Sequence, residues 1–181
     1  MVLFVRVFLF AFLIPFLLGA CAREAPARCD LSASSAIAFT AADAEDAVEA
    51  RAIGAHCTAA VAVLIVRAQD GFPIWAWAAP FHPTFGGSFA PSGETNSPTE
   101  EEMRAFLERW AQPDISTTSS APPWSEALAT AIDRATYEDI RARNTPMLCH
   151  LSGVARQTCV YWESAAASAG ALYERDAPQA P

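Results

Sequence analysis

The segment that most constrains the fold is AVAVLIVRAQDGFPIWAWAAP, residues 60–80. Asp70 and Gly71 lie between two runs rich in β-branched and aromatic residues, which are typical of strands. An Asp-Gly pair in that position predicts a two-residue type I′ turn, because both turn positions need positive φ and these residue types tolerate it. The segment therefore predicts an antiparallel hairpin.

The register of this hairpin follows from the length of its loop. With two loop residues, Val66 lies opposite Trp75 and Leu64 lies opposite Trp77. Both faces are apolar, so we expect the hairpin inside a sheet with other elements covering each side. The two tryptophans could form a sugar-stacking platform if exposed, but the scarcity of polar residues in the strand favours core packing.

Residues 81–96, FHPTFGGSFAPSGETN, are predicted to form a long irregular loop, because glycines and prolines interrupt any helical or strand period. Long loops in compact domains often carry function. Phe81, Phe85 and Phe89 recur every four residues, and together with His82 they form a candidate binding loop. The alternative is that the three rings fill a groove of the protein itself.

A helix is expected to begin at Ser97. Ser97 and Glu100 match a capping box, and Pro98 occupies the first helical position, where a missing N–H costs nothing. Four apolar residues then recur at helical spacing and predict a stripe that packs on a sheet: Met103, Phe106, Leu107 and Trp110.

The other segments give weaker signals. Pro113 ends the helix, and residues 114–123 have the composition of a connector. Residues 125–143 are predicted to hold one or two further helices, with Thr136 as a cap. The acidic, Ala-rich residues 41–50 fit either a helix or an exposed turn region.

Residues 147–162, MLCHLSGVARQTCVYW, predict a second hairpin. A two-residue loop would set Cys149 opposite Arg156, whereas a five-residue loop sets Cys149 opposite Cys159. A bridge between the two cysteines needs the second register. A final short strand is expected over residues 171–176.

The N-terminus carries a targeting signal. A short stretch that contains Arg6 precedes twelve residues, 7–18, which are all apolar. A transmembrane helix needs about 20 apolar residues, whereas the apolar region of a signal peptide needs only about 7 to 15. Residues 1–20 are therefore predicted to be a signal peptide.

Leu18, Gly19, Ala20 and Cys21 resemble the lipobox of bacterial lipoproteins, in which a branched apolar residue and two small residues precede the cysteine. The resemblance implies cleavage after Ala20 and lipidation of Cys21, which anchors the chain to a membrane without a spanning helix. Ala22, rather than an acidic residue, follows the cysteine, which in such lipoproteins implies sorting to the outer membrane.

Four cysteines remain after Cys21, namely Cys29, Cys57, Cys149 and Cys159. An even number of cysteines in an oxidising compartment predicts two disulfides. Three connectivities are open, and the spacing favours Cys149 with Cys159 and therefore Cys29 with Cys57.

The charge balance excludes several classes of function. The formal net charge is −8, and an acidic surface repels phosphate backbones, so nucleic acid is not expected as a partner. The sequence contains no lysine. Walker-type phosphate loops, pyridoxal Schiff bases and Ser-Lys nucleophile pairs all need a lysine ammonium, which arginine cannot replace. No cofactor is expected.

Two dipeptides, His56-Cys57 and Cys149-His150, could supply a Cys2His2 zinc site. Neighbouring residues on a strand point to opposite faces, and disulfides would consume the same thiols, so no metal is expected. No G-x-S-x-G, H-E-x-x-H or G-x-G-x-x-G motif occurs. A small periplasmic hydrolase that uses carboxylates with His82 or His150 is one alternative function.

A second resemblance concerns the stretch Gly170-Ala171-Leu172-Tyr173, which follows Ser168. It is similar to the small-residue-plus-tyrosine loop of membrane-anchored lysozyme inhibitors, which are also small acidic lipoproteins with disulfides. The resemblance implies a lysozyme-inhibitor-like binder as a further alternative. That family's second loop uses a lysine, which this chain does not contain.

The expected fold is α+β, with two or three helices packed on an antiparallel sheet stapled by disulfides. The expected organisation is a signal peptide (1–20), a tether (21–28), a single globular domain (29–177) and a tail (178–181). We expect a membrane-anchored lipoprotein of the bacterial envelope that faces the periplasm. Its expected role is binding or structural rather than enzymatic, with an envelope protein or a cell-wall component as partner.

Overall fold

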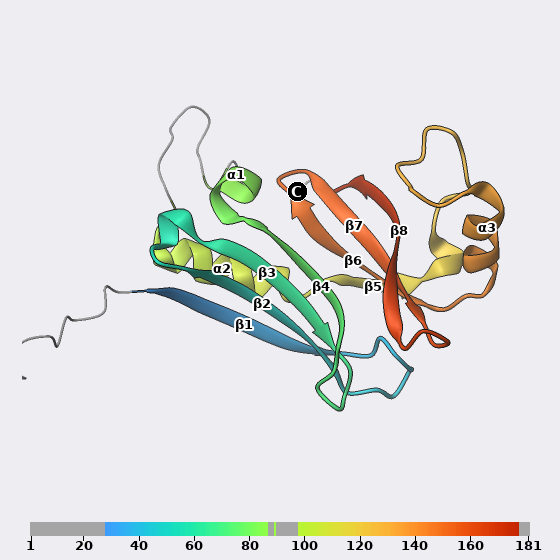
Figure 1. The fold of residues 1–181 in the computed structure, drawn as a ribbon, viewed down its shortest axis with the longest axis horizontal. Helices are drawn as coiled ribbons and strands as arrows, with labels where there is room; N and C mark the ends of the chain where they lie inside the picture. The colour runs from blue at the N-terminus through green and yellow to red at the C-terminus, as the bar shows by residue number, and fades with distance from the viewer. Residues whose placement is uncertain (1–27, 87–88, 90–97, 178–181) are drawn as a thin grey trace, which may run out of the picture.

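The computed structural model describes residues 28–86, 89 and 98–177. Two four-stranded antiparallel sheets each keep their strands in sequence order (Figure 1). Sheet A comprises β1 (Cys29–Ile37), β2 (Asp46–Gly54), β3 (Val61–Arg67) and β4 (Pro73–Pro80). Sheet B comprises β5 (Asp114–Thr117), β6 (Pro146–Gly153), β7 (Arg156–Glu163) and β8 (Ser168–Asp176). The helical segments are α1 (Phe81–Phe85), α2 (Glu100–Trp110), α3 (Arg134–Ala142) and the 3-10 turns η1 (Cys57–Ala59) and η3 (Thr118–Ser120).

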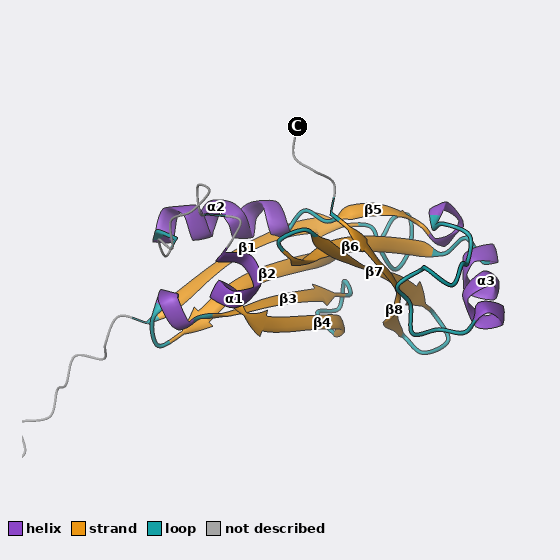
Figure 2. Cartoon of the chain, turned by 90° about the horizontal axis from the view of Figure 1, so that it is seen from above, coloured by secondary structure: helices purple, strands orange, loops and turns teal. Residues whose placement is uncertain are grey.

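The predicted combination of antiparallel strands, helices and disulfides is confirmed, but the strands form two sheets rather than one. Figure 2 shows α2 running along sheet A and α3 at the far end of sheet B. The Ser35 hydroxyl on β1 donates a hydrogen bond to the Ala111 carbonyl, which directly follows α2. Helix α2 therefore covers the β1–β2 half of one face of sheet A, called here the inner face.

The main hydrophobic core joins the two sheets. Alternate residues of β2 and β3 point to the inner face of sheet A and are fully buried: Val48, Ala50, Ala52, Ala62, Leu64 and Val66. Leu148 of β6 and Val160 of β7 belong to the same buried cluster, together with residues of α1 and α2. Sheet B thus contributes directly to the core that sheet A builds.

A second, smaller core lies on the other face of sheet B. Tyr137 and Ile140 of α3 are buried there. They cluster with Ala121 and with side chains of three strands, namely Met147, Cys149, Cys159, Leu172 and Tyr173. The segment between β5 and β6 is therefore a cover for sheet B, held by the apolar side of one short helix.

The first hairpin contains a longer turn than predicted. The Ala68 N–H donates to the Phe72 carbonyl at 2.9 Å, and the Gly71 N–H donates to the Ala68 carbonyl at 2.8 Å. Gly71 has a φ of 85°, whereas Asp70 is not among the described residues with positive φ. This is a three-residue loop that ends in a glycine bulge, not a type I′ turn.

The predicted register of this hairpin nevertheless holds. Leu64 pairs with Trp77 and Val66 pairs with Trp75, and both tryptophans pack against the main core. The extra loop residue would slip the strands by one position, but a bulge beside Val66 compensates for it. Ile74 is the inserted residue, so two departures from the prediction cancel.

The opposite, outward face of sheet A is exposed, which corrects the expectation that both faces of the hairpin are covered. Ile53 is 39% exposed and Val61 is 41% exposed, and Ala76 and Ala78 are also exposed. β4 is an edge strand. On the β3–β4 half of this face, Val61, Val63, Ala76 and Ala78 are small side chains, and each costs little when it contacts water.

A short helix forms where an irregular loop was predicted. Helix α1 contains Pro83 at its third position, in the first turn, where backbone N–H groups have no acceptor within the helix. The proline therefore removes no hydrogen bond, and its presence did not exclude a single helical turn. Residues 87–88 and 90–97 of the predicted loop lie outside the described residues.

Helix α2 begins two residues later than predicted. The capping box is formed by Thr99 and Glu102: the Thr99 side chain accepts from the Glu102 N–H at 3.2 Å, and the Thr99 N–H donates to Glu102 Oε2 at 2.7 Å. The predicted cap, Ser97, lies outside the described residues. The apolar stripe is confirmed, because all four of its residues are buried. Both pairs match the capping pattern, and spacing alone does not rank them.

Three other elements differ from the weaker signals. Asp133, not Thr136, caps α3, the one α-helix within the fully described stretch 125–143. The expected connector at 114–123 contains β5, which pairs with β6. Residues 46–50 begin β2, where Asp46, Val48 and Ala50 are buried in alternation with less buried residues; the small and charged side chains of this stretch also suit a helix.

The structure contains two disulfides. Cys29 bonds to Cys57, and Cys149 bonds to Cys159, which is the connectivity that the spacing favoured. Cys149 and Cys159 are direct cross-strand partners on β6 and β7, in the register that a bridge requires. A bulge before Gly153 and a tight turn produce this register in place of the predicted five-residue loop.

Several expectations concern parts of the chain outside the described residues. These are the signal peptide, lipidated Cys21, most of the tether, and the tail at 178–181. Among the residues that the structure describes, no helix is long and apolar enough to cross a membrane.

Candidate functional site

A hollow of about 260 Å³ lies where the end of α2 meets sheet B. Phe106 and Trp110 line it from α2, and Cys149, His150 and Leu151 line it from β6. The helix reaches this position because its apolar stripe must pack on the core, which leaves its last turn against β6. The hollow is therefore a by-product of how two packed elements meet.

The floor of the hollow is aromatic and rigid. Trp110 is 3% exposed, and its Nε1 donates to the Leu151 carbonyl at 2.9 Å. Its ring packs edge-on against Trp77 at 5.6 Å and against Phe85 at 5.3 Å between centroids. An indole that is both hydrogen-bonded and packed in this way keeps one orientation.

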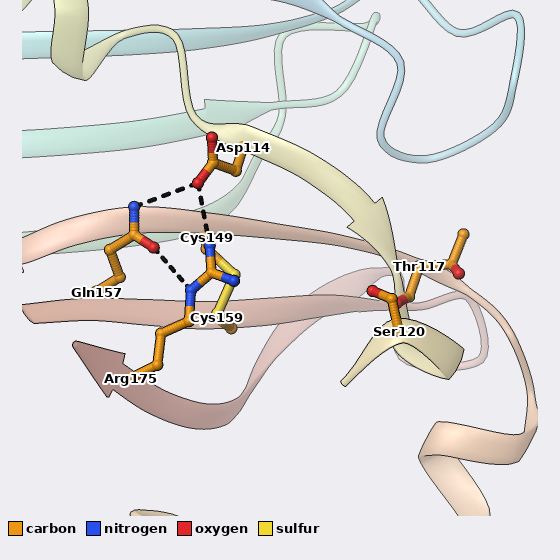
Figure 3. Close-up of a disulfide and its surroundings, with 7 residues drawn as sticks. All are labelled: Asp114, Thr117, Ser120, Cys149, Gln157, Cys159 and Arg175. Atoms are coloured by element: carbon orange, nitrogen blue, oxygen red, sulfur yellow. Dashed lines mark hydrogen bonds and ion pairs between the residues drawn. A yellow bond between two sulfur atoms is a disulfide. The ribbon is translucent and has the colours of Figure 1, made fainter. Parts of the chain in front are cut away.

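Three polar side chains from three strands of sheet B form a closed group at the rim, called here the rim triad (Figure 3). Arg175 of β8 donates to Asp114 Oδ2 of β5 at 3.0 Å and to Gln157 Oε1 of β7 at 2.8 Å. Gln157 Nε2 in turn approaches Asp114 Oδ2 at 3.4 Å. Each member of the rim triad is thus held by the other two.

The hydrogen bonds of the rim triad fix the orientation of its own three side chains but add little to the stability of the fold. Asp114 has a side chain that is 59% exposed, and that of Arg175 is 38% exposed. Exposed ion pairs of this kind contribute about 0–1 kcal/mol, because water screens them. Asp114 and Gln157 line the hollow, and exposed Arg109 adds a cation to its lining, whereas Arg175 contacts Asp114 and Gln157 from outside the lining. The rim therefore offers charges of both signs to a ligand.

His150 is buried behind this rim, with 1% of its surface exposed. Trp75 Nε1 donates to its Nε2 at 3.1 Å, and its Nδ1 lies 3.0 Å from the Leu151 carbonyl, which suits the tautomer with a proton on Nδ1. Burial lowers the pKa of His150, so the ring stays neutral. Both ring nitrogens have hydrogen-bond partners, and among the residues that the structure describes neither nitrogen contacts a carboxylate, so the ring is held as a structural group.

The described aromatic residues of the candidate binding loop are buried or partly buried. Phe81 is 1% exposed and Phe85 is fully buried, both within α1. Phe89 stacks on Phe81 at 5.8 Å and is partly buried against the main core. His82 is half-buried on the same short helix. The alternative that these rings fill a groove of the protein itself agrees with their positions.

The cysteines of the two dipeptides, Cys57 and Cys149, are both in disulfides. Cys57 bonds to Cys29 and Cys149 bonds to Cys159, so none of the four offers a thiolate to a metal. Within residues 28–86, 89 and 98–177, no group of three or more His, Cys, Asp or Glu residues could hold a metal ion.

The stretch that resembles a lysozyme-inhibitor loop forms part of strand β8. Tyr173 is 5% exposed and packs against Tyr137 at 6.5 Å between ring centroids. Tyr137 donates its hydroxyl to the Pro122 carbonyl at 2.9 Å, and burial raises its pKa to about 12. Both tyrosines are therefore parts of the smaller core rather than of an exposed loop.

The rim triad was not anticipated from the sequence. Asp114 lies 43 residues from Gln157 and 61 residues from Arg175, and no local motif marks any of the three. The one available signal was a carboxylate directly after the predicted helix end, which is too common to indicate a site.

None of the family models, curated proteins or solved structures compared with this chain matches it.

Proposed function

We propose that the protein is a lipid-anchored module of the bacterial envelope that binds a partner and performs no chemistry of its own. The apolar run at residues 7–18 and the lipobox-like residues 18–21 support the anchor. The two disulfides support an oxidising compartment such as the periplasm, because thiols in reducing compartments rarely stay paired.

The observation that carries the binding role is the state of the polar groups around the hollow. His150 uses both ring nitrogens, and the members of the rim triad bond to one another. A general acid or base needs a lone pair or a proton that can reach the substrate. Mutually fixed groups over a rigid aromatic floor instead favour recognition of a complementary surface.

The size of the hollow indicates what it receives. Its volume of about 260 Å³ is below the range of about 300–1,000 Å³ for pockets that enclose drug-sized ligands. Such a hollow fits one side chain or one sugar ring of a larger partner. The fixed charges of the rim favour a partner with polar groups around that anchor, as in an envelope protein or a cell-wall glycan.

The anchor is tested by the intact mass of the detergent-extracted protein, before and after reduction with alkylation. We expect a chain that begins at Cys21 and carries acyl chains, with four thiols that react only after reduction. The Cys21→Ser variant should leave the membrane fraction. An unmodified Cys21 in the mature protein would overturn the anchor.

The binding role is tested by cosedimentation of the lipidated protein with purified cell-wall sacculi and by cross-linking to envelope proteins. Arg109→Glu reverses a charge at the hollow and should lower the bound fraction at least tenfold. Arg104→Glu is the matched control, because Arg104 is exposed on the same helix but does not line the hollow. Equal binding by the two variants, or hydrolytic turnover that His150→Gln abolishes, would contradict the proposal.

A further inference from the structure

Exposed aliphatic residues meet at one end of the outward face of sheet A. Ile53 of β2 pairs with Val61 of β3, and Val61 pairs with Pro80 of β4, so the three form a row across adjacent strands. Ile53 and Val61 are 39% and 41% exposed, and Pro80 is also exposed. Cross-strand neighbours lie about 5 Å apart, so this row is one continuous apolar edge.

The outward face divides into two halves of different character. On the β3–β4 half, the stretch from the row to the bulge presents only apolar side chains: Val61, Val63, Ile65, Ala76, Ala78 and Pro80. The β1–β2 half carries charges that are paired with one another. Arg51 contacts Asp30 at 2.8 Å and Glu49 at 3.7 Å. The charged residues that border the apolar half are therefore in ion pairs with one another.

The apolar row lies at the end of the sheet where the chain enters it. Asp30, the second residue of β1, pairs with Ile53, so the apolar row ends at the ion pair between Asp30 and Arg51. Figure 1 shows this end of β1 on the side of sheet A away from sheet B. Seven residues separate Cys29 from Cys21, and a chain spans at most about 3.3–3.6 Å per residue. A lipid on Cys21 would thus keep this end within about 30 Å of the bilayer surface.

We propose that the Ile53–Val61–Pro80 row rests on the surface of the lipid bilayer, so that sheet B and the hollow point away from it. The proposal rests on the lipid anchor of the proposed function. The tether raises the effective concentration of this face at the membrane, so a small apolar contact suffices to hold an orientation.

The composition of the row favours lipid over a protein partner. The outward residues between 61 and 65 of β3 and between 76 and 80 of β4 include no aromatic residue and no arginine, and these are the residue types that dominate the energy of protein–protein interfaces. Arg67, at the other end of β3, contacts Glu49 of β2 at 3.4 Å. The net charge of −8 disfavours anionic headgroups, so the inferred contact is with acyl chains and zwitterionic headgroups.

The test uses the full lipidated protein in vesicles of zwitterionic phosphatidylcholine with or without brominated acyl chains, which quench nearby tryptophan. Val61→Trp places an indole in the row. Ala36→Trp is the matched control, because Ala36 is exposed on the same face at the opposite end of β1. After subtraction of the wild-type signal, we expect Val61→Trp to be quenched at least twice as strongly as Ala36→Trp. Ile53→Trp is a second probe in the same row and should follow Val61→Trp.

The outcomes separate this inference from the anchor on which it rests. If the protein fails to float with the vesicles, the anchor itself is wrong. If it floats but the Val61→Trp and Ile53→Trp variants are quenched no more than Ala36→Trp, the anchor stands and the orientation is overturned. A blue-shifted Val61→Trp emission without bromine quenching, accompanied by a cross-linked dimer, would assign the row to a second copy and also overturn the proposal.

Discussion

At the scale of single residues, Asp46 is the polar group on which the end of sheet A most depends. It is 1% exposed, and its two carboxylate oxygens accept from the backbone N–H groups of Phe39, Thr40 and Gln69 at 2.6 to 3.1 Å. One side chain thus ties the β1–β2 connection to the β3–β4 turn. A buried acceptor with several donors is costly to replace, because each donor then loses its partner.

The Asp46→Asn variant should therefore lower the free energy of unfolding by about 3 kcal/mol, since an amide group would face N–H donors with its own NH₂ group. Urea unfolding with the disulfides intact measures this loss. Asp43→Asn removes the same charge from an exposed position in the same connection and should change stability little. Similar losses for both variants would show that charge, not the buried hydrogen bonds, is responsible.

His150 makes stability depend on pH. Burial lowers its pKa in the folded protein below the ordinary value of 6.5 that it has in the unfolded chain. The unfolded chain then binds more protons as pH falls below about 6.5, so stability is full above that pH and is lost below it. The loss continues down to the folded-state pKa at a rate of up to about 1.4 kcal/mol per pH unit.

Unfolding free energies of wild type between pH 7.5 and 5.5 should therefore decline, and the decline should be much smaller in His150→Gln. His56→Gln, at an exposed histidine, is the control and should keep the wild-type slope. A slope that survives in His150→Gln would mean that other groups titrate on unfolding in this range.

At the scale of elements, the β3–β4 turn depends on one glycine. Gly71 has a φ of 85°, and a Cβ added there would meet no atom within 4 Å, so only backbone conformation opposes a side chain. Gly71→Ala should lower the unfolding free energy by about 1 kcal/mol. Gly153 lies in strand β6 and has no positive φ, and a Cβ added there would lie 3.6 Å from the Cβ of Arg156. Gly153→Ala should therefore change the unfolding free energy by less than about 0.5 kcal/mol. Thermal unfolding of the two variants compares them directly.

The elements that were predicted correctly share a physical reason. The first hairpin and the α2 stripe consist of large apolar residues in a strict period, and burial of such residues decides their structure. β2 and β5 were missed because their inward residues are small or their composition resembles a loop. Their strand conformation comes from pairing with β3 and β6, which single-segment patterns do not contain.

At the scale of the whole molecule, the core shared by the two sheets implies that they unfold together. Trp75, Trp77 and Trp110 lie at the junction of the sheets, where Trp75 bonds to His150 of β6 and Trp110 bonds to the carbonyl of Leu151. We expect tryptophan fluorescence and far-ultraviolet circular dichroism to report a single coincident urea transition. Two separated transitions would show that each sheet is stable without the other.

The candidate site also belongs to this scale, which explains why the sequence did not predict it. Asp114, Gln157 and Arg175 come from three strands and meet only because sheet B places β5 and β7 on either side of β6, with β8 beside β7. The residues that looked most functional in the sequence, Phe81 and Phe85, are core residues. Aromatic clusters in a Gly- and Pro-rich stretch have the same composition whether they face solvent or the interior.

Pro73 and Pro80 are the first and last residues of β4, one of the two edge strands of sheet A. Proline has no N–H group to offer an incoming strand, so a foreign strand could add only along the short stretch between the two prolines. This edge of sheet A therefore gives a neighbouring molecule only a short site for strand addition, whereas β1, the other edge of the same sheet, contains no proline and is the edge along which an intermolecular sheet would grow more readily.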